Sequence, residues 1–487
     1  MGKKSKTKEH RQLKTENMVV RTMMTELLQK CVSPTSSKNP SPKEQYNALK
    51  EILDMLEKIE KLKNIKGGIS QLPERETCIE SFYDWAKHKN ISFENLEIKK
   101  AANDELGIFA KAEFNEGDMF TSIPREAMMT SESVLESQIG QLVKSDPMLS
   151  SMPNVALAMY LLYELYHDKS EWKAYIQMLP RCYSNVLYFS TEDLENLKST
   201  SVFLEAEKIV RSIVRQYAYL STLLYKNPLG KDFGFIDKLT FDDYRWAVST
   251  LMTRQNPVPP SNGCTSPVLA LIPFLDMCNH KEGPVSVDYN GEAKQCECYV
   301  ATHTEAGDEL HIFYGPRPNT ELVIYNGFFY EDNTHDYIKM KFHLSKTDTQ
   351  HDIKKSLVAK LGLDEFLPIG CMPSPIKDSL QAFLQIANAS EMEVSEMLKL
   401  ESIDLAQSLG EGMITGKDTK IKGLKFLKER CSLAWRLLST VGNGQVNGEE
   451  QDVSNTKALS ILLKENEKKL LKDTLEYIDK EIENILG

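Results

Sequence analysis

Long hydrophobic runs are missing from this sequence: no apolar stretch approaches the roughly 20 residues that a membrane-spanning helix needs. The first residues, MGKKSKTKEHRQLK, have no apolar segment like that of a secretory signal. The nine cysteines among 487 residues are odd in number and unevenly spaced, which argues against a disulfide framework. An excess of basic residues is also absent, because the formal net charge is -11. We therefore expect a protein of the cytoplasm, and secondarily of the nucleus, that binds neither membranes nor nucleic acid in general.

The length of 487 residues predicts more than one domain. Apolar and polar residues alternate in short segments on both sides of a long helical stretch, which predicts an α+β fold with a helical insertion in its β-rich part. The expected domains are a polar basic tail and linker (1–43), a helical extension (44–92), a β-rich domain (93–315) with its helical insertion at about 131–255, and a mostly helical C-terminal domain (332–487).

Several elements are predicted in detail. TFDDYRWAVSTLMTRQ has Thr240 and Asp243 in the spacing of a helix N-cap. Strands are expected at LEIKKA, GIFAKA, DMFTSIP, VLALIPFL, KQCECYVAT, ELHIFYG and YIKMKFHLS. After Asp348 the sequence predicts helices to the end of the chain.

The stretch FLDMCNHKEG, Phe274 to Gly283, turns abruptly from apolar to polar. It has three interpretations: a metal site, a cofactor pocket, or a polar turn after a strand. Cys278-x-His280 and Cys296-x-Cys298 supply four zinc-type ligands, but structural zinc pairs are usually two to four residues apart. We expect no metal, and we interpret the cysteines as small core residues.

The spacing downstream favours the cofactor pocket. Asn279-His280 followed by GDELHIFYG, with NDELGIFA upstream, resembles the SET-domain methyltransferases. Gly107 matches one glycine of that family's cofactor loop, whereas Glu105 replaces the other. The helical insertion and the helical C-terminal domain resemble the Rubisco lysine methyltransferase branch. RQYAY, DYRWAVSTLMTRQN, LALIP, DMCNH and HIFYG, in this order, are similar to the actin-histidine methyltransferases of that branch.

The resemblance implies S-adenosylmethionine as the cofactor and assigns the residues around it. The cofactor pocket would be lined by Arg75, Asp104, Glu105, Leu106, Arg254, Asp276, Met277, Cys278, Asn279, His280 and Asn326. The substrate would contact Arg215, Asn256, Leu275, Tyr289 and Arg317, and Tyr314 and Asn256 would act at the reaction centre. The sequence departs from the family pattern at Leu275, where the family has Trp, and at Asn326, where it has Ser.

The resemblance implies methylation of a histidine of actin, by a protein that we expect to be a monomer. Imidazole, with a pKa near 6.5, is mostly neutral at cytosolic pH, whereas a lysine amine, near 10.4, must first lose a proton. A histidine acceptor therefore needs orientation more than a strong base, and the Asn256 amide can provide it by hydrogen bonding to one ring nitrogen. The alternatives are a protein-lysine methyltransferase and a catalytically silent scaffold that binds a protein partner.

Overall fold

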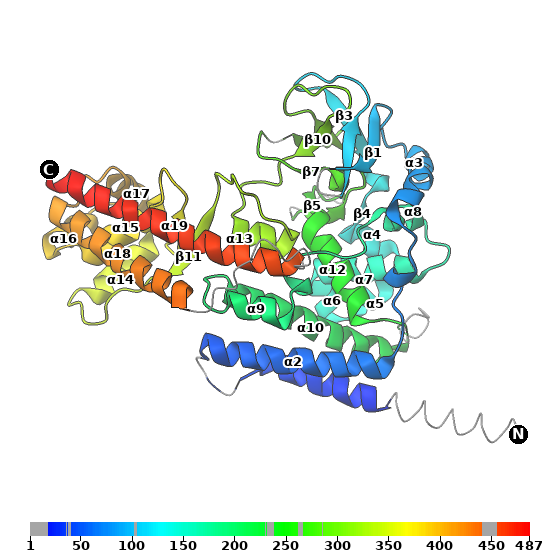
Figure 1. The fold of residues 1–487 in the computed structure, drawn as a ribbon, viewed down its shortest axis with the longest axis horizontal. Helices are drawn as coiled ribbons and strands as arrows, with labels where there is room; N and C mark the ends of the chain where they lie inside the picture. The colour runs from blue at the N-terminus through cyan, green and yellow to red at the C-terminus, as the bar shows by residue number, and fades with distance from the viewer. Residues whose placement is uncertain are drawn as a thin grey trace, which may run out of the picture. The chain divides into compact units, whose positions relative to one another are not determined.

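The structure is a computed structural model that describes residues 18–35, 37, 40–101, 105–228, 230, 238–261, 266–284, 286–440 and 455–487. The chain forms two compact units (Figure 1). The first unit contains Met1–Pro40, Asn47–Tyr188 and Lys208–Gly315, and the second contains Ser41–Tyr46, Phe189–Glu207 and Pro316–Gly487. Both mix helices and strands, so the expected α+β class is confirmed.

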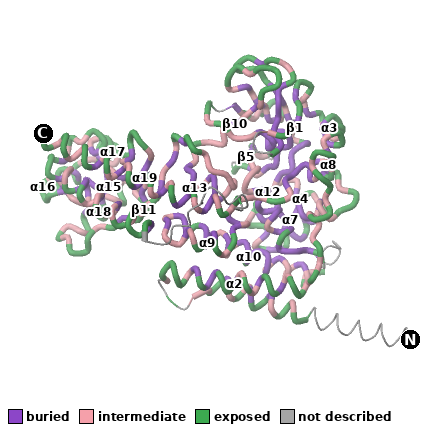
Figure 2. Tube along the Cα trace, in the orientation of Figure 1, coloured by how far each residue is buried: buried purple, intermediate pink, exposed green. Residues whose placement is uncertain are grey.

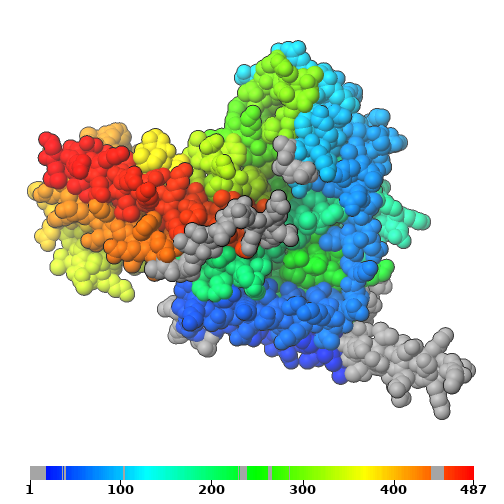
Figure 3. Space-filling model, in the orientation of Figure 1, coloured from blue at the N-terminus to red at the C-terminus, as the bar shows by residue number. Residues whose placement is uncertain are grey.

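The N-terminal part of the first unit is more ordered than the sequence predicted. Residues 18–32, which we expected in a polar tail, are helical, and Leu27 and Cys31 are fully buried. The helix expected near residue 44 is α2 (Pro42–Lys63), which buries Leu49, Ile52 and Ile59. The other side of α2 stays on the surface (Figure 3). The apolar positions at helical spacing therefore form one buried stripe.

The strands of the first unit form three small sheets. Their orders are β1-β2-β10-β7, β3-β9-β8 and β4-β6-β5. The bounds are β1 Leu96–Lys100, β2 Leu106–Ala110, β3 Met119–Pro124, β4 Met129–Thr130, β5 Gln255–Val258, β6 Val268–Leu271, β7 Asn279–His280, β8 Val287–Asn290, β9 Gln295–Tyr299 and β10 Glu309–Ile312. β2 is buried along its whole length because β1 and β10 flank it. The short strand β8 was not predicted.

Helices occupy the insertion between β4 and β5, as predicted. They are α4 Ser131–Glu136, α5 Gly140–Ser145, α6 Pro147–Ser151, α7 Pro153–Tyr166, α8 Lys173–Met178, α9 Thr191–Leu197, α10 Phe203–Lys226 and α12 Phe241–Arg254. The apolar helix α7 is buried over most of its length (Figure 2) and packs against α12. Thr240 caps α12 by accepting a hydrogen bond from the Asp243 N–H, which confirms the predicted start. Three short helices precede the sheets: η1 Ile69–Gln71, η2 Arg75–Cys78 and α3 Ile79–His88.

The second unit places helices around a two-stranded antiparallel sheet, β11 with β12. Its elements after residue 316 are α13 Asn319–Glu321, η6 Leu322–Asn326, β11 Tyr337–Lys341, α14 His351–Lys360, β12 Phe366–Gly370, α15 Asp378–Asn388, α16 Glu391–Met397, α17 Ser402–Gly410, α18 Lys417–Thr440 and α19 Asn455–Leu486. The prediction of uninterrupted helix after Asp348 was wrong at β12, because its five residues include Pro368 and gain strand structure only by pairing with β11.

Candidate active site

The turn that follows β6 contains the polar residues which the sequence singled out. Phe274 has a φ of 69°, a left-handed conformation that is uncommon for a bulky residue. Its ring is fully buried and stacks on Phe82 and Phe93, with ring centroids 5.0 Å apart in both pairs. The short helix η5 (Leu275–Met277) follows and leads into β7. Aromatic packing thus holds a strained turn in one conformation, and we call Phe274–His280 the polar turn.

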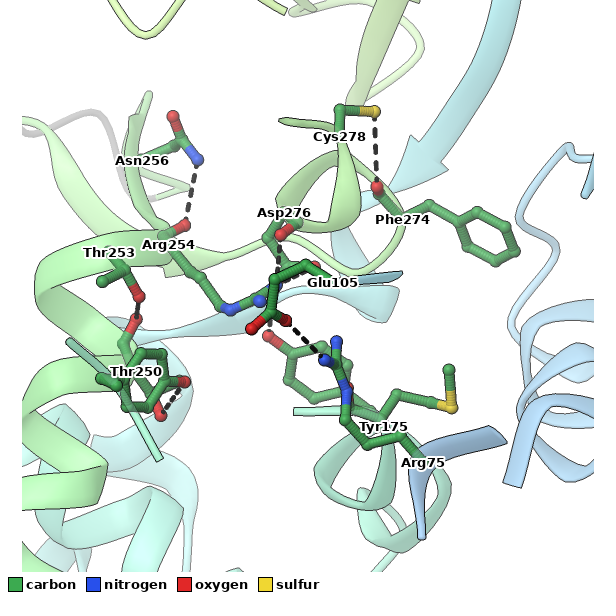
Figure 4. Close-up of polar contacts among 12 residues, drawn as sticks. Arg75, Glu105, Tyr175, Thr250, Thr253, Arg254, Asn256, Phe274, Asp276 and Cys278 are labelled. Carbon is green, nitrogen blue, oxygen red and sulfur yellow. Dashed lines mark hydrogen bonds and ion pairs between the residues drawn. The ribbon is translucent and has the colours of Figure 1, made fainter. Parts of the chain in front are cut away.

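Arg254 and Asp276 form the centre of a buried polar network (Figure 4). Arg254 is the last residue of α12, and a terminal nitrogen of its guanidinium donates a hydrogen bond to the Asp276 carbonyl oxygen. The same nitrogen lies 3.8 Å from Asp276 Oδ1. The Tyr175 hydroxyl donates to Asp276 Oδ2. This network joins the insertion helices α8 and α12 to the polar turn.

The network leaves one donor and one acceptor unused. Asp276 Oδ1 and Arg254 Nε are both buried and have no hydrogen-bond partner in the described part of the chain. Burial raises the pKa of Asp276 to about 6, although Arg254 and Tyr175 act in the opposite direction. Burial would lower the pKa of Arg254, but Tyr183 and Asp276 beside it raise that pKa above its ordinary value. A buried acceptor and a buried donor without partners are typical of a site that binds a polar ligand.

Arg75 brings a second cation to this region. Its Nε donates to the Met178 carbonyl oxygen at 2.9 Å, and its Nη1 lies 2.9 Å from Glu105 Oε2. Burial lowers the pKa of Arg75, and the charge of Arg254 lowers it further. Glu105 is largely exposed whereas Arg75 is mostly buried. Figure 4 shows both arginines pointing toward the polar turn, so positive charge is concentrated there.

Tyr314 lies at the other side of the polar turn, just after β10. Its hydroxyl donates to the Cys278 carbonyl oxygen at 2.8 Å, and its backbone N–H donates to His280 Nδ1 at 3.2 Å. The pairing of β7 with β10 is parallel, with His311 opposite Asn279. This pairing brings two motifs that are far apart in the sequence into direct contact.

Asn256 and Tyr289 lie on short strands of two different sheets. Asn256 lies on β5, two residues after Arg254, and its Nδ2 donates to the Arg254 carbonyl oxygen at 3.1 Å. Tyr289 lies on β8, and its hydroxyl accepts a hydrogen bond of 3.2 Å from Arg125. Both side chains are partly exposed, as residues that contact a substrate must be.

The remaining predicted residues fall into three groups. Leu106, Leu275, Met277 and Cys278 are buried around the polar turn and would meet a ligand mainly through their backbone. Arg215 is exposed on α10. Arg317 and Asn326 belong to the second unit and bond to each other at 3.2 Å. Asp104 lies outside the described residues.

Sequence reasoning missed three residues of the region. Tyr175, which is fully buried, and Tyr183, which is partly exposed, lie beside Arg254, and Glu309 accepts a hydrogen bond of 2.6 Å from Asn279 Nδ2. Glu309 was visible as the Glu of GDELHIFYG, but no role was assigned to it. The two tyrosines stand in an ordinary apolar helix and in the loop after it, about 100 residues from Asp276, and carry no local signal.

No group of three or more His, Cys, Asp or Glu side chains in the described residues could hold a metal ion. No helix in the same residues is long and apolar enough to cross a membrane.

Comparison with known proteins identifies relatives along almost the whole chain. No family model matches. The chain is 34% identical over 483 residues to the actin-histidine N-methyltransferase of Gallus gallus, covering 97% of this chain and 80% of that protein. It is also 34% identical over 482 residues to the enzyme of that name from Mus musculus, with the same coverage.

Solved structures with a similar fold are also found. A structure of Rubisco LSMT bound to AdoMet superposes with a TM-score of 0.64 at 18% identity, covering 84% of this chain and 93% of that chain. A SET domain of LSMT bound to lysine and AdoHcy superposes with a TM-score of 0.65 at 18% identity, covering 85% and 93%. The chain therefore belongs to the SET-domain protein methyltransferases, in the branch related to Rubisco LSMT.

Proposed function

We propose that this protein is an S-adenosylmethionine-dependent protein-histidine N-methyltransferase that methylates actin. The observation that carries the proposal is the 34% identity to an actin-histidine N-methyltransferase over 97% of this chain. The geometry around the polar turn supports a methyl transfer of this kind in three respects: the binding of the methyl donor, the orientation of the acceptor, and the contacts of Tyr314.

The unused polar atoms of the network fit the amino-acid end of S-adenosylmethionine. That end carries an ammonium group, which donates hydrogen bonds, and a carboxylate, which accepts them. Asp276 Oδ1 is a buried acceptor and Arg254 Nε a buried donor, and Arg75 adds a further cation. The donor supplies an electrophilic methyl group on sulfur, and these residues bind and orient it. The backbone of Leu106, Met277, Cys278 and His280 completes the proposed pocket, to which Glu105, Asp104 and Asn326 were also assigned.

Asn256 is suited to select the reactive form of an imidazole. Because its Nδ2 already donates to the Arg254 carbonyl, its Oδ1 remains as an acceptor. An acceptor binds the protonated ring nitrogen and leaves the lone pair of the other nitrogen free to attack. The ordinary imidazole pKa makes a general base unnecessary at cytosolic pH. Asn256 thus orients a histidine acceptor, while Arg215, Leu275, Tyr289 and Arg317 are proposed to hold the surrounding peptide.

Tyr314 positions the transfer. Its hydroxyl is bound to the Cys278 carbonyl in the polar turn, and its ring is 5.1 Å from that of His280. The phenol therefore has a fixed direction beside the proposed donor pocket. A direct displacement depends on such alignment of donor and acceptor and on the exclusion of water.

The test uses purified actin, the protein and isotope-labelled S-adenosylmethionine, with mass spectrometry to locate the label. We expect label on a histidine. Two actin-derived peptides that differ only in His or Lys at the acceptor position measure the preference, and Asn256→Phe should shift that preference toward lysine. Faster methylation of the lysine peptide by the unaltered protein would establish the lysine alternative. Donor binding without any methylation of actin or the peptides would instead favour the silent scaffold.

A further inference from the structure

Three motifs of the sequence meet at one hydrogen bond. Asn279 of the polar turn donates from Nδ2 to Glu309 Oε1 at 2.6 Å. Asn279 lies on β7 and Glu309 on β10, which are paired in parallel. Gly107 lies on β2, which pairs with β10 on the other side. The cofactor-loop motif, the Asn-His motif and the Glu of GDELHIFYG therefore lie next to one another.

Gly107 has no side chain because this pair occupies the space. A Cβ added to Gly107 would lie 2.5 Å from Glu309 Oε1 and 3.1 Å from Asn279 Nδ2. The first distance is shorter than van der Waals contact allows, so an alanine at this position would push the carboxylate away. The requirement for glycine is steric and comes from the Asn279–Glu309 pair, since Gly107 does not have a positive φ.

The chemistry of the pair fixes the direction of the Asn279 amide. An ionised carboxylate only accepts hydrogen bonds, whereas an amide has one donating and one accepting end. With a carboxylate oxygen 2.6 Å away, the nitrogen end of Asn279 must face Glu309. Oδ1 of Asn279 then points away from Glu309, and among the described residues it accepts no hydrogen bond.

Glu309 is itself held in place. Its side chain is only 17% exposed, and Oε2 lies 3.5 Å from His311 Nε2. Nδ1 of the same ring is 3.1 Å from the Glu309 carbonyl oxygen. The carboxylate is therefore bound on both sides, by Asn279 and by His311, and it has little freedom to release the amide.

We propose that Glu309 is a positioning residue for the methyl donor: it locks the Asn279 amide so that Oδ1 is presented as an acceptor to the donor's ammonium group. The inference rests on the proposed function. Glu309 does not touch the donor itself but orients the Asn279 side chain that does. Gly107 belongs to the same arrangement because the absence of a side chain there leaves space for the Glu309 carboxylate. Without the carboxylate, the amide can rotate and present its donating end to a cation, which is unfavourable.

A double-mutant cycle tests the proposal. Affinity for S-adenosylhomocysteine is measured calorimetrically for the unaltered protein, Asn279→Ala, Glu309→Ala and the double variant. We expect each single variant to lose about tenfold in affinity. Because Glu309 acts through Asn279, the double variant should lose no more than Asn279→Ala alone. Multiplicative losses would overturn the proposal, since they would mean that Glu309 acts independently.

Matched variants separate positioning from folding. Glu309→Gln retains an accepting oxygen but adds a donating nitrogen, so it should keep part of the lock and lose less affinity than Glu309→Ala. His311→Ala removes the other contact of Glu309 and should have a smaller effect than Glu309→Ala. Gly107→Ala should reproduce the loss of affinity of Glu309→Ala, because its Cβ displaces the carboxylate. If Glu309→Gln is as impaired as Glu309→Ala, the proposal is wrong. If the unaltered protein binds no donor, the proposed function itself fails, which is a distinguishable result.

Discussion

Asp276 in the first unit and Glu467 in the second are both buried carboxyl groups whose pKa is raised by burial, to about 6 and about 7 respectively. Their surroundings differ. Glu467 on α19 accepts from the Ser201 N–H at 2.9 and 3.1 Å and from the Ser201 hydroxyl at 3.1 Å. Asp276 has one oxygen without a hydrogen-bond partner and an arginine beside it. A raised pKa is thus common to both carboxyl groups, whereas the unmet hydrogen bond and the neighbouring arginine belong to Asp276 and not to Glu467.

The comparison predicts its largest effect at Arg254. Arg254→Ala leaves the Asp276 carboxylate buried without its cation, which costs about 3–5 kcal/mol in comparable buried pairs. We expect no measurable binding of S-adenosylhomocysteine and a lower unfolding temperature. Arg430→Ala is the control, because Arg430 donates a hydrogen bond to the backbone carbonyl of Lys341 and lies in the second unit. Donor binding by Arg254→Ala within threefold of the unaltered protein would contradict the assignment.

A smaller effect is expected when each carboxyl group is made neutral. Asp276→Asn removes the charge that would bind the donor's ammonium and should weaken donor binding roughly 10- to 100-fold. Glu467→Gln should leave donor binding unchanged.

The pH dependence of donor binding provides a second test of the same two variants. Asp276 must be ionised to bind a cation, so the affinity of the unaltered protein should fall as the pH is lowered through about 6. Asp276→Asn should lack this step, and Glu467→Gln should retain it. The measurement is a series of calorimetric titrations between about pH 5 and 8. The same pH profile in all three proteins would contradict the role of Asp276 in donor binding.

Two tyrosines extend the comparison to the reaction itself. Tyr314→Phe removes the hydroxyl that binds the Cys278 carbonyl and should lower turnover roughly tenfold, about 1.4 kcal/mol, while the protein stays folded. Tyr325→Phe removes a phenol of the second unit that donates to Glu205 at 2.8 Å, and its turnover should stay normal. Steady-state rates on actin decide between the two, and equal losses would remove Tyr314 from the mechanism.

The last prediction concerns the effect of Glu467 on the pH dependence of stability. Its pKa of about 7 in the folded protein exceeds the value of about 4.3 for an exposed glutamate. Between these values the folded state retains a proton that the unfolded state has lost. Stability should therefore fall as the pH rises through this window, by at most about 1.4 kcal/mol per pH unit. Thermal unfolding of Glu467→Gln should show a weaker pH dependence than that of the unaltered protein, and a parallel curve would contradict the shift.

Local patterns predicted much of the fold. The capped start of α12 and the alternating strand β11 were found because their signals lie within a few adjacent residues. The helix at 18–32 was missed because the basic run before it and the linker composition after it suggested a polar tail, whereas Leu27 and Cys31 are buried. β12 depends on its partner β11 and has no strong pattern of its own.

Residues of the candidate site could be predicted from the sequence only where they belong to a recognisable motif. Asn279, His280 and Tyr314 lie in recognisable segments, and the structure joins them through β7 and β10. Tyr175 and Tyr183 become visible only when α8 and the loop after it pack beside Arg254. Arg215 was assigned by resemblance alone, and its exposed position on α10 leaves that assignment a prediction.

The left-handed backbone at Phe274 has a consequence for how a ligand meets the polar turn. Such a conformation costs on the order of 1–3 kcal/mol for a residue with a side chain. Stacking of its ring on Phe82 and Phe93 compensates this cost when the chain folds. The polar turn then needs no further ordering when a ligand arrives, so little conformational entropy is lost on binding. A rigid receptor of this kind selects its ligand by shape and polarity, and the aromatic packing at the base of the turn determines part of its affinity.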